Sequence, residues 1–291
     1  MHFQRDKLGQ EIHRSNGQGF ELAQSWDAVG QLEEQVAGSI KRAYEWSRGY
    51  DPKAIKDGRW GEKRYDYDPN GQITKTRHGG TSEEQFSYNA DLNLSGTDTA
   101  DDEHAQFQDW QTSAAGVVRL ARGPKGEVVK LEHDANGRVV SRIIEQKGFR
   151  PKKWAFEWNA TDQLIRAHCP DGSIWSYEYD PFGRRINKSC SSSHSSFIWD
   201  GDVIASEAVT ENGRFSVTEW FYEPDSFRPL ARKQAELYYI VNDHLGTPKE
   251  MVSETGRMMW AADHDTWGTL RGCRTWRPHR RWCSSSPTST V

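Results

Sequence analysis

The stretch that decides the fold is Tyr177-Glu-Tyr-Asp-Pro-Phe-Gly-Arg-Arg-Ile186. Tyr177 and Tyr179 are two residues apart, a spacing that places both rings on one face of a β-strand. Asp180 can accept hydrogen bonds from the turn that follows it, and Gly183 tolerates the positive φ that closes such a turn. The stretch therefore predicts a strand, a turn and a second strand, which together form a β-hairpin.

The Asp-x-x-Gly pattern of this hairpin recurs along the whole chain. Complete copies are Asp6 to Gly9, Asp27 to Gly30, Asp68 to Gly71, Asp134 to Gly137, Asp180 to Gly183, Asp243 to Gly246 and Asp265 to Gly268. Degenerate copies begin at Asn89, Asn159 and Asp200, and worn copies lie near Ser47, Gln111 and Tyr222. With these copies included, the repeat has a period of about 21 residues, so we expect one hairpin per repeat.

Aromatic residues precede the turns at alternate positions. The aromatic residues that come directly before the turn are Tyr67, Tyr88, Trp158, Tyr179 and Trp199, each with an aromatic partner two residues earlier. We expect these rings to pack on one face of the array, and the aspartates and glycines to have structural roles in the turns.

A single hairpin is not stable in water, so neighbouring hairpins must associate. The predicted fold is therefore all-β, with repeated antiparallel β-hairpins over residues 1–271. Residues 21–36 have some helical spacing, but a repeat turn interrupts it, and we expect strands there. Residues 272–291 do not continue the repeat and are expected to be a divergent tail, either disordered or translated out of frame.

Composition supports a thin, aromatic-rich β-structure. The 291 residues carry a net charge of −4, and only 35% are hydrophobic, yet 13 are Trp, 10 are Tyr and 11 are Phe. So many rings with few aliphatic residues suit thin layers between strands better than one thick core. The mixed charge gives no reason to expect nucleic acid as the main partner, and no stretch is apolar enough to cross a membrane.

No pattern of catalytic or cofactor-binding residues stands out. Aspartates that recur in one turn position are better explained by turn chemistry than by acid catalysis. His168-Cys169 and His264-Asp265 are the nearest to metal-ligand clusters, and neither has zinc spacing. The stretch Ser189–Ser196 holds Ser, Cys and His but lies where a polar loop is expected. We therefore expect no enzyme activity, no cofactor and no metal.

The repeat resembles the YD repeat of bacterial Rhs proteins and of the related teneurin and insecticidal-toxin shells. Tyr179–Ile186 is similar to a late repeat of the Rhs core. Phe197–Asp202, Tyr222–Arg232 and Asn242–Glu250 then follow in the family's order. The resemblance covers roughly residues 3–271.

The resemblance implies a curved β-ribbon that forms the wall of a hollow shell. Such shells enclose a C-terminal toxin, and bacterial members are commonly delivered by a type VI secretion system. Family cores end in a D-P-x-G block followed by the toxin, and that block is absent here. The resemblance thus implies a truncated core without its own toxin domain, in which no aspartate takes the family's self-cleavage role.

Three explanations of residues 272–291 stay open: a shifted reading frame, a divergent tip and a binding tail. Three functions are also open: a structural shell wall, a carbohydrate- or protein-binding surface and a self-processing toxin precursor. The first is preferred, with the rest of an Rhs shell, a toxin or its secretion machinery as partners. The N-terminal residues contain no apolar run, which predicts no signal peptide and a cytoplasmic location in the producing cell. The resemblance to Rhs proteins implies export by a type VI-like route.

Overall fold

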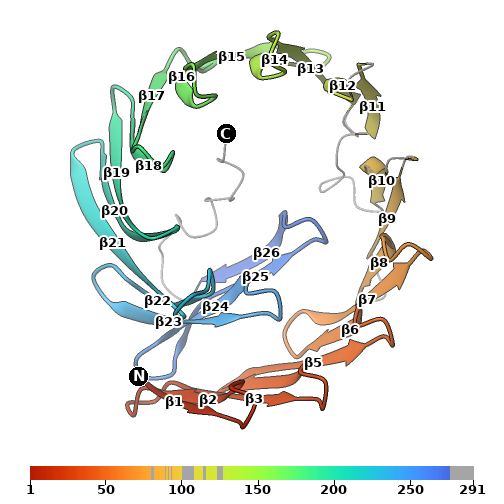
Figure 1. Ribbon diagram of the computed structural model, residues 1–291, viewed down its shortest axis with the longest axis vertical. Coiled ribbons are helices and arrows are strands. Elements are labelled where there is room, and N and C mark those ends of the chain that lie inside the picture. The colour runs from red at the N-terminus through yellow and green to blue at the C-terminus, as the bar shows by residue number, and fades with distance from the viewer. Residues whose placement is uncertain are drawn as a thin grey trace. The chain divides into compact units, whose positions relative to one another are not determined.

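The computed structural model describes residues 1–79, 82–88, 90, 92, 94–99, 108–113, 116–122 and 127–275 (Figure 1). Every helix or strand assigned within these residues is a β-strand, and 26 strands are present there. Consecutive strands are hydrogen-bonded neighbours within two sheets, and the registered pairs are antiparallel. The predicted all-β array of antiparallel hairpins is therefore confirmed.

The first sheet contains ten strands in chain order. They are β1 (His2–Arg5), β2 (Glu11–Ser15), β3 (Glu21–Trp26), β4 (Leu32–Ala37), β5 (Ile40–Trp46), β6 (Pro52–Asp57), β7 (Gly61–Tyr67), β8 (Ile73–His78), β9 (Ser82–Tyr88) and β10 (Leu94–Thr99). Residues 21–36, with their partly helical spacing, thus form β3, a turn and β4.

The second sheet contains 16 strands, again in chain order. They are β11 (Gln108–Thr112), β12 (Val118–Arg122), β13 (Val128–His133), β14 (Val139–Glu145), β15 (Lys152–Trp158), β16 (Leu164–His168), β17 (Ile174–Tyr179), β18 (Arg185–Ser189), β19 (Ser193–Asp200), β20 (Val203–Glu211), β21 (Arg214–Tyr222), β22 (Pro229–Lys233), β23 (Leu237–Asn242), β24 (Pro248–Ser253), β25 (Met258–His264) and β26 (Leu270–Thr275). The strand β26 therefore runs across the expected boundary at residue 271.

The repeat turns join each odd-numbered strand to the next even-numbered strand. Successive turns of an antiparallel sheet alternate between the two ends of its strands, so the Asp-x-x-Gly turns within each sheet lie at the same end. The register shifts at the residue before the turn, for example between Glu178 and Tyr179 and between Ser25 and Trp26. A type I turn followed by glycine in the left-handed region produces such a bulge, which increases the local twist of the hairpin.

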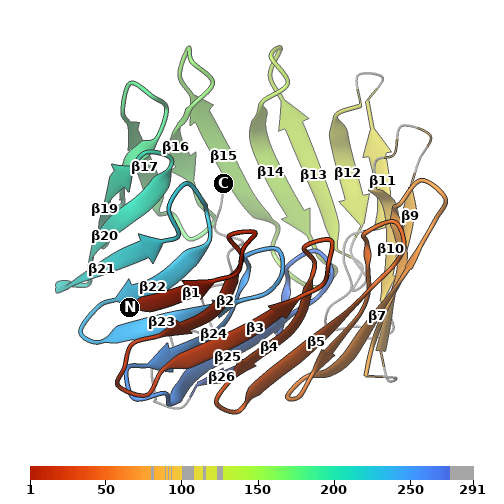
Figure 2. The ribbon, with the colours of Figure 1, turned by 60° about the horizontal axis from the view of Figure 1, so that its bottom comes forward.

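The chain divides into two compact units. Unit 1 comprises residues 1–85 and 220–291, and unit 2 comprises residues 86–219. In unit 1, strands β22–β26 form a second layer that packs against the first hairpins (Figure 2). Phe20 stacks on Tyr239 with the ring centroids 4.5 Å apart, and both side chains are buried. Burying one such ring contributes about 1.5–3 kcal/mol, so this core holds the two layers together.

Two glycine turns make a backbone contact at this packed interface. A Cβ added to Gly256, where φ is 77°, would lie 2.3 Å from the carbonyl oxygen of Gly19. The side chain of Asn16 also donates a 2.8 Å hydrogen bond to the carbonyl of Glu254. The second layer therefore approaches the first closely enough to exclude side chains at these turns.

The strands β11–β20 of unit 2 are consecutive neighbours in one sheet. Its apolar cluster consists of Phe156, Leu164 and Ala167, with half-buried Val139, Trp154, Trp158, Trp175 and Tyr177 around them. The alternation of aromatic and polar residues in β15 and β17 puts these rings on one face. Among the described residues, no helix has the length and apolarity that crossing a membrane would require.

Candidate functional site

The repeat turns are built in the same way along the chain. In the turn after β17, the N–H of Gly183 donates to the carbonyl of Asp180 at 3.0 Å, and Gly183 has a φ of 83°. The carboxylate oxygen Oδ1 of Asp180 accepts from the backbone N–H groups of Phe182 and Arg184, each at 2.9 Å. The aspartate thus satisfies donors that the tight turn leaves without a strand partner.

All seven complete copies share this hydrogen-bond pattern. The Gly-to-Asp backbone bonds measure 3.1, 3.1, 3.0, 3.0, 3.0, 3.1 and 3.3 Å in the turns that begin at Asp6, Asp27, Asp68, Asp134, Asp180, Asp243 and Asp265. The corresponding glycines Gly9, Gly30, Gly71, Gly137, Gly183, Gly246 and Gly268 all have positive φ. In every copy, Oδ1 of the aspartate accepts two backbone N–H groups.

Two of the diverged copies keep the same geometry with other side chains. The hydroxyl of Ser47 and the amide oxygen of Asn159 each accept two backbone N–H groups of their own turn. Tyr50 and Asp162 then occupy the glycine position with φ of 69° and 60°. Asn89, where another diverged copy begins, lies outside the residues that the structure describes.

The aromatic residue before the turn joins its hairpin to the preceding one. Tyr179 in β17 donates its hydroxyl to the carbonyl of Leu164 at 2.9 Å, and Leu164 begins the second strand of the preceding repeat. The matching bonds run from Trp26 to Glu11, Trp46 to Leu32, Tyr67 to Pro52, Trp158 to Val139 and Trp199 to Arg185, at 2.7–2.9 Å. Tyr88 lies in β9, where it is half-buried.

These bonds add a polar role that the sequence analysis did not foresee. Rings at alternate positions indicate packing, whereas the structure shows that the indole N–H or phenol O–H also bridges successive repeats. Asn242 occupies the same position before Asp243 and donates its amide to the carbonyl of Pro229 at 2.7 Å. The feature that these positions share is therefore a side-chain hydrogen-bond donor in the residue before the turn, and an aromatic side chain is one way to supply it.

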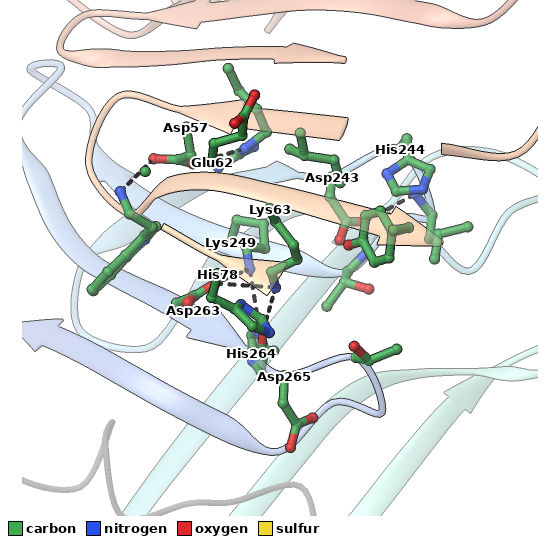
Figure 3. Close-up of a pocket in the computed structure, with 18 of the residues that line it drawn as sticks. Asp57, Glu62, Lys63, His78, Asp243, His244, Lys249, Asp263, His264 and Asp265 are labelled. Carbon is green, nitrogen blue, oxygen red and sulfur yellow. Dashed lines mark hydrogen bonds and ion pairs between the residues drawn. The ribbon is translucent and has the colours of Figure 1, made fainter. Parts of the chain in front are cut away.

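A polar pocket of about 150 Å³ lies in unit 1, between β5–β8 and the turns after β23 and β25 (Figure 3). Lys63, Lys249, Asp263 and His264 point toward one another in it. Both lysine Nζ atoms lie 3.6 Å from Oδ1 of Asp263, and Lys63 donates to the carbonyl of His264 at 2.5 Å. One carboxylate therefore compensates two ammonium groups.

Burial and the charges in the pocket lower the pKa values of Lys249, Asp263 and His264. Burial, followed by the charge of Lys249, lowers the pKa of His264 to about 4. Burial and then the charge of Lys63 lower the pKa of Lys249. Burial alone would raise the pKa of Asp263, but Lys63 and Lys249 outweigh it and the pKa is lowered. His264 is therefore neutral at neutral pH.

A buried ion-pair network adjoins the pocket. Arg42, with a side chain only 2% exposed, pairs with Glu250 at 2.5 Å and with Asp57 at 3.0 Å. Arg59 lies 3.8 Å from the same oxygen of Glu250. The network joins β5 and β6 of the first layer to β24 of the second, so it connects residues about 200 positions apart in the sequence.

The candidate metal-binding residues of the sequence have other partners. His168 contacts the carboxylate of Glu157 at 2.7 Å, and His264 faces the two pocket lysines. His244, in the turn after β23, packs edge-on against Tyr44 and Trp46 with ring centroids 5.3 Å away. Within the described residues, no three His, Cys, Asp or Glu side chains are placed to hold a metal ion.

Sequence reasoning missed the pocket and the ion-pair network. The seven repeat aspartates and their glycines are spread over the turns of both units, and only Asp243, Asp265, Gly268 and their neighbours reach the pocket. Arg42 and Lys63 occupy ordinary strand positions with no local motif. Lys249 and Glu250 end the block Asn242–Glu250, but that block does not indicate which residues they contact. Only their neighbours in the folded unit distinguish them from the many exposed charges of the chain.

Comparisons with known proteins agree with the repeat. Residues 154–189 match the family described as RHS Repeat, and residues 237–272 match the family described as RHS protein. The chain is 28% identical over 284 residues to "Probable deoxyribonuclease RhsA" of Dickeya dadantii (strain 3937), covering 90% of this chain and 19% of that protein. The resemblance to Rhs and YD-repeat proteins is therefore confirmed.

Other relatives are more distant. "Toxin protein Tse5" of Pseudomonas aeruginosa is 24% identical over 340 residues, covering 91% of this chain and 25% of that protein. "Teneurin-4" of Homo sapiens is 26% identical over 164 residues, covering 52% of this chain and 6% of that protein. The crystal structure of TcdB2-TccC3 matches with a TM-score of 0.46 and 15% identity, covering 92% of this chain and 17% of that one. The chain spans about a fifth of the length of its RhsA and RhsB relatives.

Proposed function

We propose that this chain is a structural wall segment of an Rhs-type shell that encloses a toxin for delivery between bacteria. Its partners are then the remainder of the shell, a toxin and the secretion machinery, with export from the cytoplasm by a type VI-like route. The Rhs family likeness supports the shell, and the relative named Tse5, a toxin protein, supports the association with toxins.

The observation that carries this proposal is the bond from the residue before each turn to the preceding repeat. A wall must resist separation of its strands. Backbone pairing already joins successive hairpins, as between β2 and β3 and between β16 and β17, and the bond from the residue before the turn adds a side-chain link to that pairing. Six ring donors, from Trp26 to Trp199, add a bond between successive repeats. The stability of a repeat array is approximately a sum over its repeats and their interfaces, so each such bond strengthens the array.

The wall proposal is tested by exchange of segments with a relative. The part of Tse5 that aligns with this chain is replaced by residues 1–275, and the purified chimera is treated with protease. We expect a protease-resistant particle visible by electron microscopy. A matched chimera that carries Tyr67→Phe, Trp158→Phe, Tyr179→Phe and Trp199→Phe should be digested faster. Equal digestion of the chimera and of a Tse5 variant that lacks the segment would rule out a wall role.

We also propose that the repeat array has no catalytic activity of its own. Its repeat aspartates are occupied by turn hydrogen bonds, which favours a structural role for them. The test is incubation of the purified chain for several days, with and without plasmid DNA, because one relative is named a deoxyribonuclease. Intact mass spectrometry should find only the full-length chain, and the DNA should stay uncut. Self-cleavage or DNA cleavage that Asp263→Asn abolishes would contradict the proposal.

A further inference from the structure

One face of the sheet in unit 2 combines aromatic rings with cations. Register places Arg142 of β14 opposite Trp154 of β15, and Tyr177 of β17 opposite Lys188 of β18, so that each pair shares a face. Phe156, Ala167 and Trp175 are successive cross-strand partners on that same face. We call the surface formed by Arg142, Trp154, Trp175, Tyr177, Arg185 and Lys188 the cationic aromatic face.

The cations of this face lie over the rings. Arg142 is 5.2 Å from the ring centroid of Trp154, and Lys188 is 4.7 Å from that of Trp175. Arg185 lies between two rings, 5.7 Å from Tyr177 and 5.6 Å from Phe197. Such contacts hold the positive groups in fixed positions at the surface of the sheet.

Within the described residues, no carboxylate lies at ion-pair distance from Arg142, Arg185 or Lys188. Burial, followed by the charge of Arg185, lowers the pKa of Lys188. The carboxylate of Glu207, which lies opposite Phe197 on the same face, opposes this shift without reversing it. All three side chains are only partly exposed. Among the described residues, the face therefore carries three cations without an ion-pair partner, and Glu207 compensates them only in part.

The opposite face of the same strands has a different charge pattern. Lys130 pairs with Glu145 at 2.7 Å, and Arg166 pairs with Glu157 at 3.0 Å. Glu157 also accepts a contact from His168 at 2.7 Å. Lys130 and Arg166 on the opposite face therefore have acidic partners within ion-pair distance, whereas Arg142, Arg185 and Lys188 have none among the described residues.

We propose that the cationic aromatic face binds an acidic, extended polypeptide segment. Guanidinium groups hydrogen-bond carboxylates in a bidentate manner, and the rings around them offer apolar contact for the neighbouring side chains of such a segment. Nucleic-acid bases and sugar rings need a free ring face for stacking, and here the cations already occupy ring faces. The proposal does not depend on the wall function, because it concerns unit 2 alone.

The test measures binding of labelled probes to the full chain by fluorescence anisotropy. The acidic probe is a fluorescein-labelled 12-residue peptide of alternating Glu and Ser, and its matched control has Lys in place of Glu. We expect the chain to bind the acidic peptide, to bind the basic peptide at least about tenfold more weakly, and to lose affinity for the acidic peptide as salt rises. Equal binding of both peptides would overturn the proposal.

Two triple variants locate the binding surface. Arg142→Gln, Arg185→Gln and Lys188→Gln together remove the cations of the cationic aromatic face. Lys153 lies opposite Ile143, which is also the partner of Lys130, so both lysines are on the opposite face. Lys130→Gln, Lys153→Gln and Arg166→Gln remove three cations from that face and change net charge equally. The first variant should weaken acidic-peptide binding about tenfold or more, about 1.4 kcal/mol, and the second should change it by less than about twofold. Similar losses in both would overturn the proposal.

Further probes and variants keep the result decisive. A 12-nucleotide oligo-dT and a heparin hexasaccharide test the other anionic polymers. If either binds more tightly than the acidic peptide, and the first triple variant abolishes that binding, the polypeptide assignment is wrong. Should the triple variant fail to fold by circular dichroism, Arg185→Gln alone is compared with Arg166→Gln. Only Arg185→Gln is expected to reduce binding, and equal effects would overturn the proposal.

Discussion

In six hairpins, a hydroxyl or indole N–H of the residue before the turn adds a side-chain bond to the preceding hairpin. Tyr179 is half-buried and reaches the carbonyl of Leu164 across the strand pair. The ring provides apolar contact and the hydroxyl provides a directional hydrogen bond, so substitution can separate the two contributions. The repeat therefore depends on polar atoms of residues that are usually counted as part of an aromatic core.

Tyr179→Phe removes that hydroxyl and keeps the ring. We expect the free energy of unfolding to fall by about 1 kcal/mol, because the carbonyl of Leu164 loses one intramolecular hydrogen bond. Chemical denaturation of the variant and the parent chain measures the change. Tyr50→Phe is the control, since Tyr50 is 64% exposed at a turn tip, and it should leave stability unchanged. Equal effects of the two substitutions would show that the bond is not stabilising.

His264 makes unit 1 sensitive to acid. Its pKa is about 4 in the folded chain, below the ordinary value of about 6.5 expected after unfolding. Between these values the unfolded chain binds the proton and the folded chain does not, so stability is lost as pH falls from about 6.5 to about 4. Denaturation at pH 7.0, 5.5 and 4.5 should show this loss. His264→Gln should reduce the slope, and His194→Gln, at an exposed position, should not.

At the scale of the element, local chemistry predicts the hairpins well. The Asp-x-x-Gly turns, the strands between them and the strand assignment of residues 21–36 agree with the structure. Turn residues act within four positions of one another, which is why sequence spacing reveals them. The sequence does not predict in the same way which strand faces another layer covers. The aromatic pattern of a strand is similar whether or not a second layer packs on its face.

The close contact between the turns that contain Gly19 and Gly256 occurs where the second layer packs on the first. Gly183 and Gly256 both have positive φ, but only at Gly256 would a Cβ meet backbone atoms of another turn. Gly183→Ala should cost about 1–2 kcal/mol through backbone strain alone. Gly256→Ala should cost more, because Gly19 must also move. Thermal unfolding of the two variants compares them, and equal losses would mean that the turns do not hold the layers together.

The buried ion pairs make the layer contact specific. Arg42→Met leaves the carboxylate of Glu250 buried, with Arg59 at 3.8 Å as its remaining cation, and should destabilise the chain by about 3–5 kcal/mol. The double variant Arg42→Met with Glu250→Leu removes both charges and should recover most of that loss. Denaturant titration measures both. No recovery in the double variant would indicate that Arg42 acts through packing instead of charge.

On the scale of the whole molecule, the two units differ in the number of layers. In unit 1, β23–β25 are mostly buried and lie against the first hairpins, whereas the strands of unit 2 are mostly intermediate in exposure. Amide hydrogen exchange should therefore be slowest in β23–β25 and faster in β15–β18. Mass spectrometry of exchanged peptides tests this. Uniform protection across both units would contradict the difference in layering.

The sequence by itself determined the hairpin, its period, the turn geometry and the likeness to Rhs proteins, because all of these depend on residues a few positions apart. Only the tertiary structure decided which aromatic face is covered by β22–β26 and which face carries unmatched cations. It also decided that Arg42 meets Glu250 and that Lys63 and Lys249 share Asp263. The pairs Arg42–Glu250 and Lys63–Asp263 join residues about 200 positions apart, and similar local patterns in the repeats contain no information that selects one long-range partner over another.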